Sequence, residues 1–73
     1  PLAGEIFADP EDPDVEACVA TVSRNTGSPD VTATGMFQGI ESTVVSVYAD
    51  GAPWRCTVDD RGRVTAIVPV SGR

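Results

Sequence analysis

The stretch APWRCTVDDRGRV, residues 52–64, predicts the centre of the fold. Strand side chains alternate between the two faces of a sheet, so one apolar face carries Trp54, Cys56 and Val58. Residues 60–62 then reverse the chain, and Gly62 supplies the positive φ that such hairpin turns require. The same alternation in the next segment predicts a matching face that carries Val64, Ala66 and Val68.

A single helix is predicted over residues 13–26. Pro13 suits the first helical position, and Asp12 before it has the side chain of an N-cap. Gly27 is placed to end the helix. The apolar positions follow the spacing of one helical face, and they are Val15, Cys18, Val19 and Val22.

The only two cysteines, Cys18 and Cys56, lie 38 positions apart, which fits neither a CxxC redox pair nor a four-ligand zinc site. Cys18 is on the apolar stripe of the helix and Cys56 is on the apolar face of a strand. These two surfaces must meet when one helix covers one sheet, so we predict a disulfide between them. Closing this loop stabilises a small domain by roughly 4 kcal/mol.

Strand-forming residues dominate after Pro29, with turn residues at short intervals. The predicted strands are residues 31–38, 42–49, 54–59 and 63–70. Gly35 indicates a bulge or a close backbone approach, and Pro69 indicates that the last strand lies at an edge or ends there. We therefore expect a two-layer α+β fold, in which one N-terminal helix packs on a three- to four-stranded antiparallel meander sheet. Residues 1–12 are expected to form an acidic extended lead-in, and residues 13–73 a single domain.

The net charge is −6, and it is concentrated near the start of the chain. Six acidic residues stand within the first sixteen positions, whereas the remainder balances five acids against five arginines. Nucleic acid is not an expected partner, because binding it requires a concentrated basic face. No apolar run approaches the roughly 18 residues of a membrane span.

The side-chain inventory predicts no catalytic residues, no cofactor and no metal site. Histidine and lysine are absent, which excludes Ser-His-Asp and Cys-His catalysis and a Schiff-base lysine. Asp59 and Asp60 are adjacent in a turn, and this favours a polar hairpin over a catalytic pair. The run DPEDPDVE lacks the later glycine and glutamate of a calcium loop, so at most weak cation binding is expected there.

Three arginines of the hairpin, Arg55, Arg61 and Arg63, form the predicted partner-binding surface. Arg55 and Arg63 are expected to lie near each other on the outward face, with Arg61 at the turn. Guanidinium groups are favoured at protein interfaces. The alternative is that these arginines pair with nearby carboxylates on a solvated sheet surface. Trp54, the sole tryptophan, is expected to close the core beside the disulfide.

Two stretches, ACVATVSRNTG and TVVSVYADGAPWRCTVDDRGRV, resemble a group of small exported proteins from α-proteobacteria. The shared pattern is a helix with a cysteine, a Thr/Val-rich strand, then Ala-Pro-Trp-Arg-Cys at 52–56 and a turn that ends in Gly-Arg-Val. The resemblance covers residues 17–67. It implies export and the cysteine bridge, but no activity, because the group is functionally uncharacterised. The helix-on-sheet layout is also similar to PepSY-like domains, which resemble inhibitory or regulatory modules of exported enzymes.

These observations predict a non-enzymatic extracytoplasmic module that binds a protein or a cell-envelope component, or that has a structural role. A disulfide persists in oxidising compartments, so a periplasmic or secreted location is expected. The chain starts at Pro1 without a methionine, as expected of a processed or trimmed chain, and such a chain can have lost a targeting segment. The alternative function is an inhibitor or regulator of an exported hydrolase, acting through residues 50–53 or the acidic lead-in. A free sheet edge that accepts a partner strand is a second possible binding surface.

Overall fold

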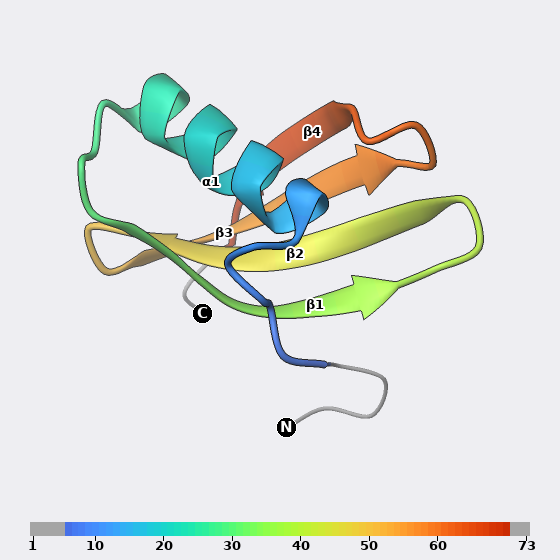
Figure 1. The fold of residues 1–73 in the computed structure, drawn as a ribbon. Coiled ribbons are helices and arrows are strands. Elements are labelled where there is room, and N and C mark those ends of the chain that lie inside the picture. Colours follow the sequence, from blue (N-terminus) through green and yellow to red (C-terminus); the bar gives the residue numbers. More distant parts are fainter. Residues whose placement is uncertain (1–5, 71–73) are drawn as a thin grey trace.

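The computed structural model describes residues 6–70 and shows one helix lying across one face of a sheet (Figure 1). The elements follow one another as α1 (Pro13–Thr26), β1 (Val31–Gln38), β2 (Ser42–Ala49), β3 (Ala52–Asp59) and β4 (Val64–Pro69). The strands lie in the order β1-β2-β3-β4, and every neighbouring pair is antiparallel. The predicted two-layer α+β meander is confirmed, and the sheet has four strands.

Local signals determine both ends of α1. The Asp12 side chain accepts the backbone N–H of Asp14 at 2.9 Å, which satisfies one of the unpaired donors of the first turn. Gly27 has a φ of 71°, and its N–H donates to the carbonyl of Ser23. This left-handed conformation is easily accessible only to glycine, so the helix ends where its sequence predicts.

The predicted disulfide joins the helix to the middle of the sheet. The Cys18 and Cys56 Cα atoms are 5.9 Å apart, and both residues are completely buried. Core side chains surround the bridge and come from the helix and from three strands; the fully buried ones are Val15, Val22, Met36, Val45, Val47 and Val58. Trp54 is only partly buried and packs against this cluster, as expected of a residue at the margin of the core.

The predicted inward face of β4 is wrong beyond Val64. Val64 pairs with Val58, but Thr57 pairs with Ala66, so Thr65 is an extra residue in β4. This β-bulge shifts the alternation by one position. Ile67 consequently lies opposite Cys56 and packs against the core, whereas Val68 lies opposite Arg55 and is 53% exposed.

The turns differ slightly from expectation. Asp50 and Gly51 alone connect β2 to β3, with φ values of 53° and 81°, so β3 begins two residues earlier than predicted. Asp-Gly suits such a two-residue hairpin because both positions need positive φ. The bulge expected at Gly35 is present, since the register of β1 shifts between Ala33 and Gly35. Pro69 is the last residue of the edge strand β4.

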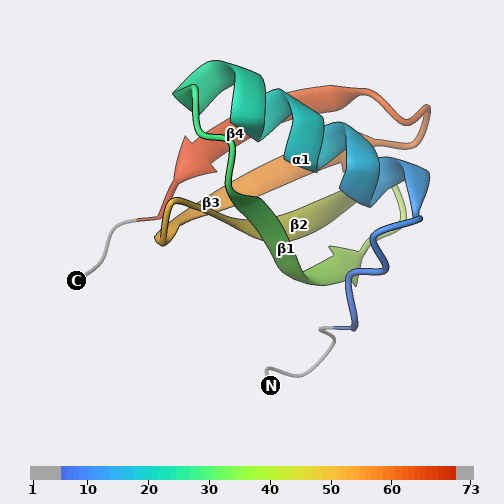
Figure 2. The same ribbon diagram turned by 60° about the vertical axis from the view of Figure 1, so that its left-hand side comes forward.

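The lead-in contacts the domain from Ile6 onward, while residues 1–5 lie outside the described part of the chain. The Ile6 N–H donates to the Met36 carbonyl at 2.8 Å, and the Met36 N–H donates to the Ile6 carbonyl at 3.0 Å. Ala8 is then 4% exposed and belongs to the core. Figure 2 shows this segment running from the edge of β1 up to the start of α1. It therefore closes one end of the space between the helix and β1.

Candidate functional site

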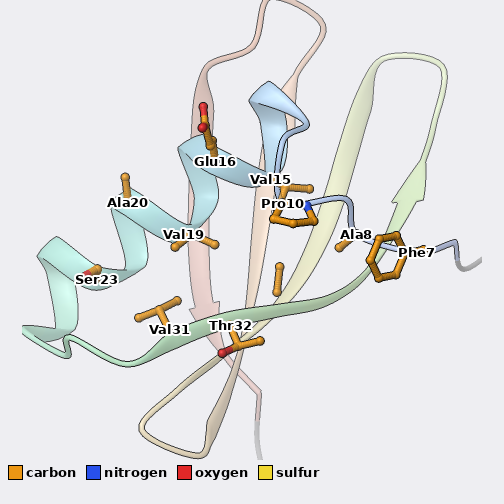
Figure 3. A pocket seen from close by; sticks show the side chains of 11 residues that line it. Phe7, Ala8, Pro10, Val15, Glu16, Val19, Ala20, Ser23, Val31 and Thr32 are labelled. Atoms are coloured by element: carbon orange, nitrogen blue, oxygen red, sulfur yellow. The ribbon is translucent and has the colours of Figure 1, made fainter.

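An apolar groove of about 540 Å³ lies between α1 and β1, and its volume is within the range of small-ligand and peptide pockets. We call it the α1/β1 groove. Figure 3 shows Val19 of the helix and Val31 of β1 pointing toward each other across it. The lining residues are Phe7, Ala8, Pro10, Val15, Glu16, Val19, Ala20, Ser23, Val31, Thr32 and Ala33.

The groove exists because the single helix leaves the β1 side of the sheet incompletely covered. Val19 and Val31 pack against the core, yet both remain partly exposed. At the end formed by the lead-in, Phe7 is 77% exposed beside β1 (Figure 3). The polar Ser23 does not make the lining more polar, since its hydroxyl donates to the Ser28 carbonyl at 2.7 Å. The groove thus presents apolar surface to solvent.

The charges around this groove are acidic. Glu16 is the one charged residue among the described residues of the lining, and it is exposed on the helix. Asp9 stands between two lining residues of the lead-in, and Asp30 immediately precedes Val31 at the other end; both are exposed. A ligand with apolar side chains and flanking positive charge is therefore electrostatically favoured.

The structure does not bring the three predicted arginines together. Arg55 lies on the face of the sheet opposite α1, between Ser46 of β2 and Val68 of β4. Arg61 and Arg63 belong to the β3–β4 turn, four residues farther along β3. At about 3.3 Å per residue this separates Arg55 from Arg63 by roughly 13 Å along the strand. The expected Arg55–Arg63 adjacency is wrong, whereas partner binding by these residues stays a prediction.

Arg63 lies beside the helix. It lines a shallow depression with residues of α1, among them Ala17, Thr21 and Arg24. The two guanidinium groups of Arg24 and Arg63 therefore belong to one side of the molecule, the β4 side, away from the acidic groove. Arg55 is exposed on the outer face of the sheet, where Tyr48 and Val68 are also exposed.

Asp59 organises the β3–β4 turn. Its Oδ1 accepts the backbone N–H groups of Arg61 and Arg63, each at 2.9 Å. The pKa of Asp59 is lowered mainly by the hydrogen bond from the backbone N–H of Arg63. The hydrogen bond from Arg61 and the charges of both guanidinium groups also lower this pKa, while partial desolvation raises it. An ionised carboxylate held by backbone donors is typical of a structural turn.

Asp14, in the first turn of α1, has the opposite perturbation. Burial raises its pKa, and the nearby carboxylates of Asp12 and Asp59 add to the effect. Within residues 6–70, no group of three or more His, Cys, Asp or Glu side chains is arranged to hold a metal ion. In the same range, no helix has the length and apolarity needed to cross a membrane.

The sequence pattern did not predict the groove; it placed Val15 and Val19 on the helical face that packs on the sheet. The available signal was the apolar triplet of residues 6–8 inside an otherwise acidic lead-in. Comparison with known proteins adds no relative: no protein family, curated protein or solved structure matches this chain. The resemblance to small exported proteins and the PepSY-like layout therefore stay predictions.

Proposed function

We propose that this protein is a non-enzymatic extracytoplasmic module that binds a segment of a partner protein in the α1/β1 groove. The observation that carries the proposal is the open apolar lining of the groove, with Phe7 exposed at one end. Concave apolar sites of this size are where proteins commonly bind their ligands. The groove is built on a helix and a strand that a disulfide joins to one core, so it is preformed.

Two further observations support the proposal. Among the described lining residues no nucleophile is paired with a base: the polar side chains there are Glu16 and Ser23, and the Thr32 side chain points to the outer face of the sheet. The buried Cys18–Cys56 bridge fits an oxidising compartment, which supports a periplasmic or secreted location.

An inhibitor function has less support. Residues 50–53 were one candidate for a loop that fills an enzyme cleft, but Asp50 and Gly51 form a tight turn and the next two residues belong to β3. The described part of the lead-in, the other candidate, packs on β1 and the core through Ile6 and Ala8. Neither segment projects as a long free loop.

The test is peptide display with a matched pair of variants. A random-peptide library is selected on the wild-type protein, and the recovered peptides are measured against Val31→Thr and Val44→Thr. Both substitutions replace a methyl group by a hydroxyl at a partly exposed strand position, but only Val31 lines the groove. Val44 pairs with Thr57 on the outer face.

We expect Val31→Thr to weaken binding about fivefold to tenfold, because it places a hydroxyl in an apolar contact. Val44→Thr should leave the affinity unchanged. Equal affinities for both variants would refute the groove as the binding site. If Arg55→Ala alone abolished binding, the outer face of the sheet would be the site instead.

A further inference from the structure

The outer edge of β1 has an unpaired section directly beside the α1/β1 groove. Met36 exchanges both of its backbone hydrogen bonds with Ile6, so its N–H and C=O face this edge. In an antiparallel ladder, residues alternate between the two edges of a strand. Met36 pairs with Val45, and Ala33 pairs with Val47, two positions farther along β2. Ala33 therefore faces the same edge as Met36, with the bulge absorbing the extra residue.

The alternation continues to Val31, which pairs with Ala49. Val31 and Ala33 thus direct their N–H and C=O groups to an edge that no other strand within residues 6–70 covers, since β1 is terminal in the sheet and the Ile6 bridge ends at Met36. The same two residues line the groove with their side chains. The N–H and C=O groups of these two residues, four in all, are therefore available to hydrogen-bond an added strand, and the apolar lining of the groove is available to its side chains.

Building on the proposed function, we propose that the bound segment is an extended, basic peptide that adds to β1 beside Val31 and Ala33. Residues of the peptide that face these two positions place their side chains in the groove, because directly paired residues share a face of the sheet. Apolar side chains are required at those alternate positions. The intervening residues point to the outer face, where Thr32 and Tyr48 form a pair.

Two features of the chain support this occupant. The lead-in already pairs with β1 at Met36, so the edge accepts an extended segment in this position. The exposed carboxylates of Asp9, Glu16 and Asp30 surround the groove and favour lysine or arginine at the ends of the peptide. A second copy of this chain is disfavoured as the occupant, because it would bring the same carboxylates and a net charge of −6 to this edge.

The probe is a capped synthetic peptide with a lysine at each end and alternating valine and threonine between them. The peptide is expected to run antiparallel to β1, as Ile6 does in its bridge to Met36, so the valine N–H groups face β1 and the threonine N–H groups face solvent. N-methylation of the central valine removes one hydrogen bond to the edge, whereas N-methylation of a neighbouring threonine is the matched control. A third peptide has glutamate in place of both lysines.

We expect the peptide methylated at valine to bind about tenfold more weakly than the parent peptide, and the peptide methylated at threonine to bind within about twofold of it. The glutamate peptide should bind at least about tenfold more weakly than the parent. Amide exchange measured by NMR should slow at Val31 and Ala33 in the complex and change little at Thr32, which is already bonded to β2.

Several outcomes would overturn the inference. Strand addition would be refuted if NMR resonances of groove residues shifted on binding while amide exchange at Val31 and Ala33 stayed unchanged. Equal effects of N-methylation at the valine and at the threonine would refute it as well. Either result would leave the proposed function intact. Equal binding of the glutamate peptide would refute the basic preference. The proposed function would be refuted as well if the parent peptide shifted no NMR resonance of a groove residue and peptide display recovered no peptide whose binding is weakened by Val31→Thr. Sedimentation showing a dimer that dissociates when the peptide binds would identify a second copy as the natural occupant.

Discussion

Reduction of the Cys18–Cys56 disulfide should remove about 4 kcal/mol of stability. The bridge closes a loop with a sequence separation of 38, and the loss of unfolded-chain entropy for a loop of that length gives this figure at 25 °C. A chain of 73 residues has a total stability of roughly 4 to 11 kcal/mol at the usual value per residue. The cross-link therefore supplies a third or more of the margin that keeps the protein folded.

The measurement is guanidinium unfolding followed by the fluorescence of Trp54, which lies two residues from Cys56 on the same face of β3. Both cysteines are completely buried, so the reductant must be added to unfolded protein before refolding. The slope of the transition should also rise on reduction, because the unfolded chain then exposes more surface. A Cys18→Ala/Cys56→Ala double variant serves as the control and should not respond to the reductant.

A difference below about 1 kcal/mol between the oxidised and reduced proteins would refute this reasoning, since loop entropy would then contribute little. So would two free thiols, detected by mass spectrometry, in the native protein isolated from its own compartment. The second result would also remove the main support for an extracytoplasmic location.

The other predictions concern the register, two carboxylates and one turn. Ile67→Thr should lower the free energy of unfolding by about 1 to 2 kcal/mol and Val68→Thr by less than about 0.5 kcal/mol, because the bulge turns Ile67 toward the core. Chemical denaturation measures both, and a larger loss for Val68→Thr would contradict the register of β4. The pKa of Asp59 is lower in the folded state, so its carboxylate stabilises the fold at pH values above the unfolded pKa near 3.8. This stabilisation is lost as the pH falls through the lower folded-state pKa. Asp59→Asn should therefore make stability depend less on pH at the acid end of a stability-pH profile. Asp14 has a raised folded-state pKa, so Asp14→Asn should increase stability at neutral pH, with the gain disappearing as the pH falls through that raised value; a loss at pH 7 would contradict the sign. Gly51→Ala should lower stability by about 1 kcal/mol in thermal unfolding because its φ is 81°, and an unchanged midpoint would exclude this strain.

Most of the fold was predictable because its signals are local. The N-cap Asp12, the terminating Gly27 and the apolar spacing between them define α1 within the helix itself. The disulfide was predictable for a related reason: periodicity alone placed Cys18 and Cys56 on the two surfaces that had to meet. Of the candidate site, by contrast, only a free sheet edge was anticipated, as a second possibility.

The amino-acid sequence by itself determined the element types, their order and the cross-link, because caps, turn glycines and hydrophobic period act over a few residues. Tertiary structure alone decided the bulge at Thr65, the pairing of Ile6 with Met36 and the groove between α1 and β1. Each of these depends on how segments distant in the chain align and on how much of a sheet one helix can cover. Such choices are made by competition among long-range pairings and packing, which no short window of residues encodes.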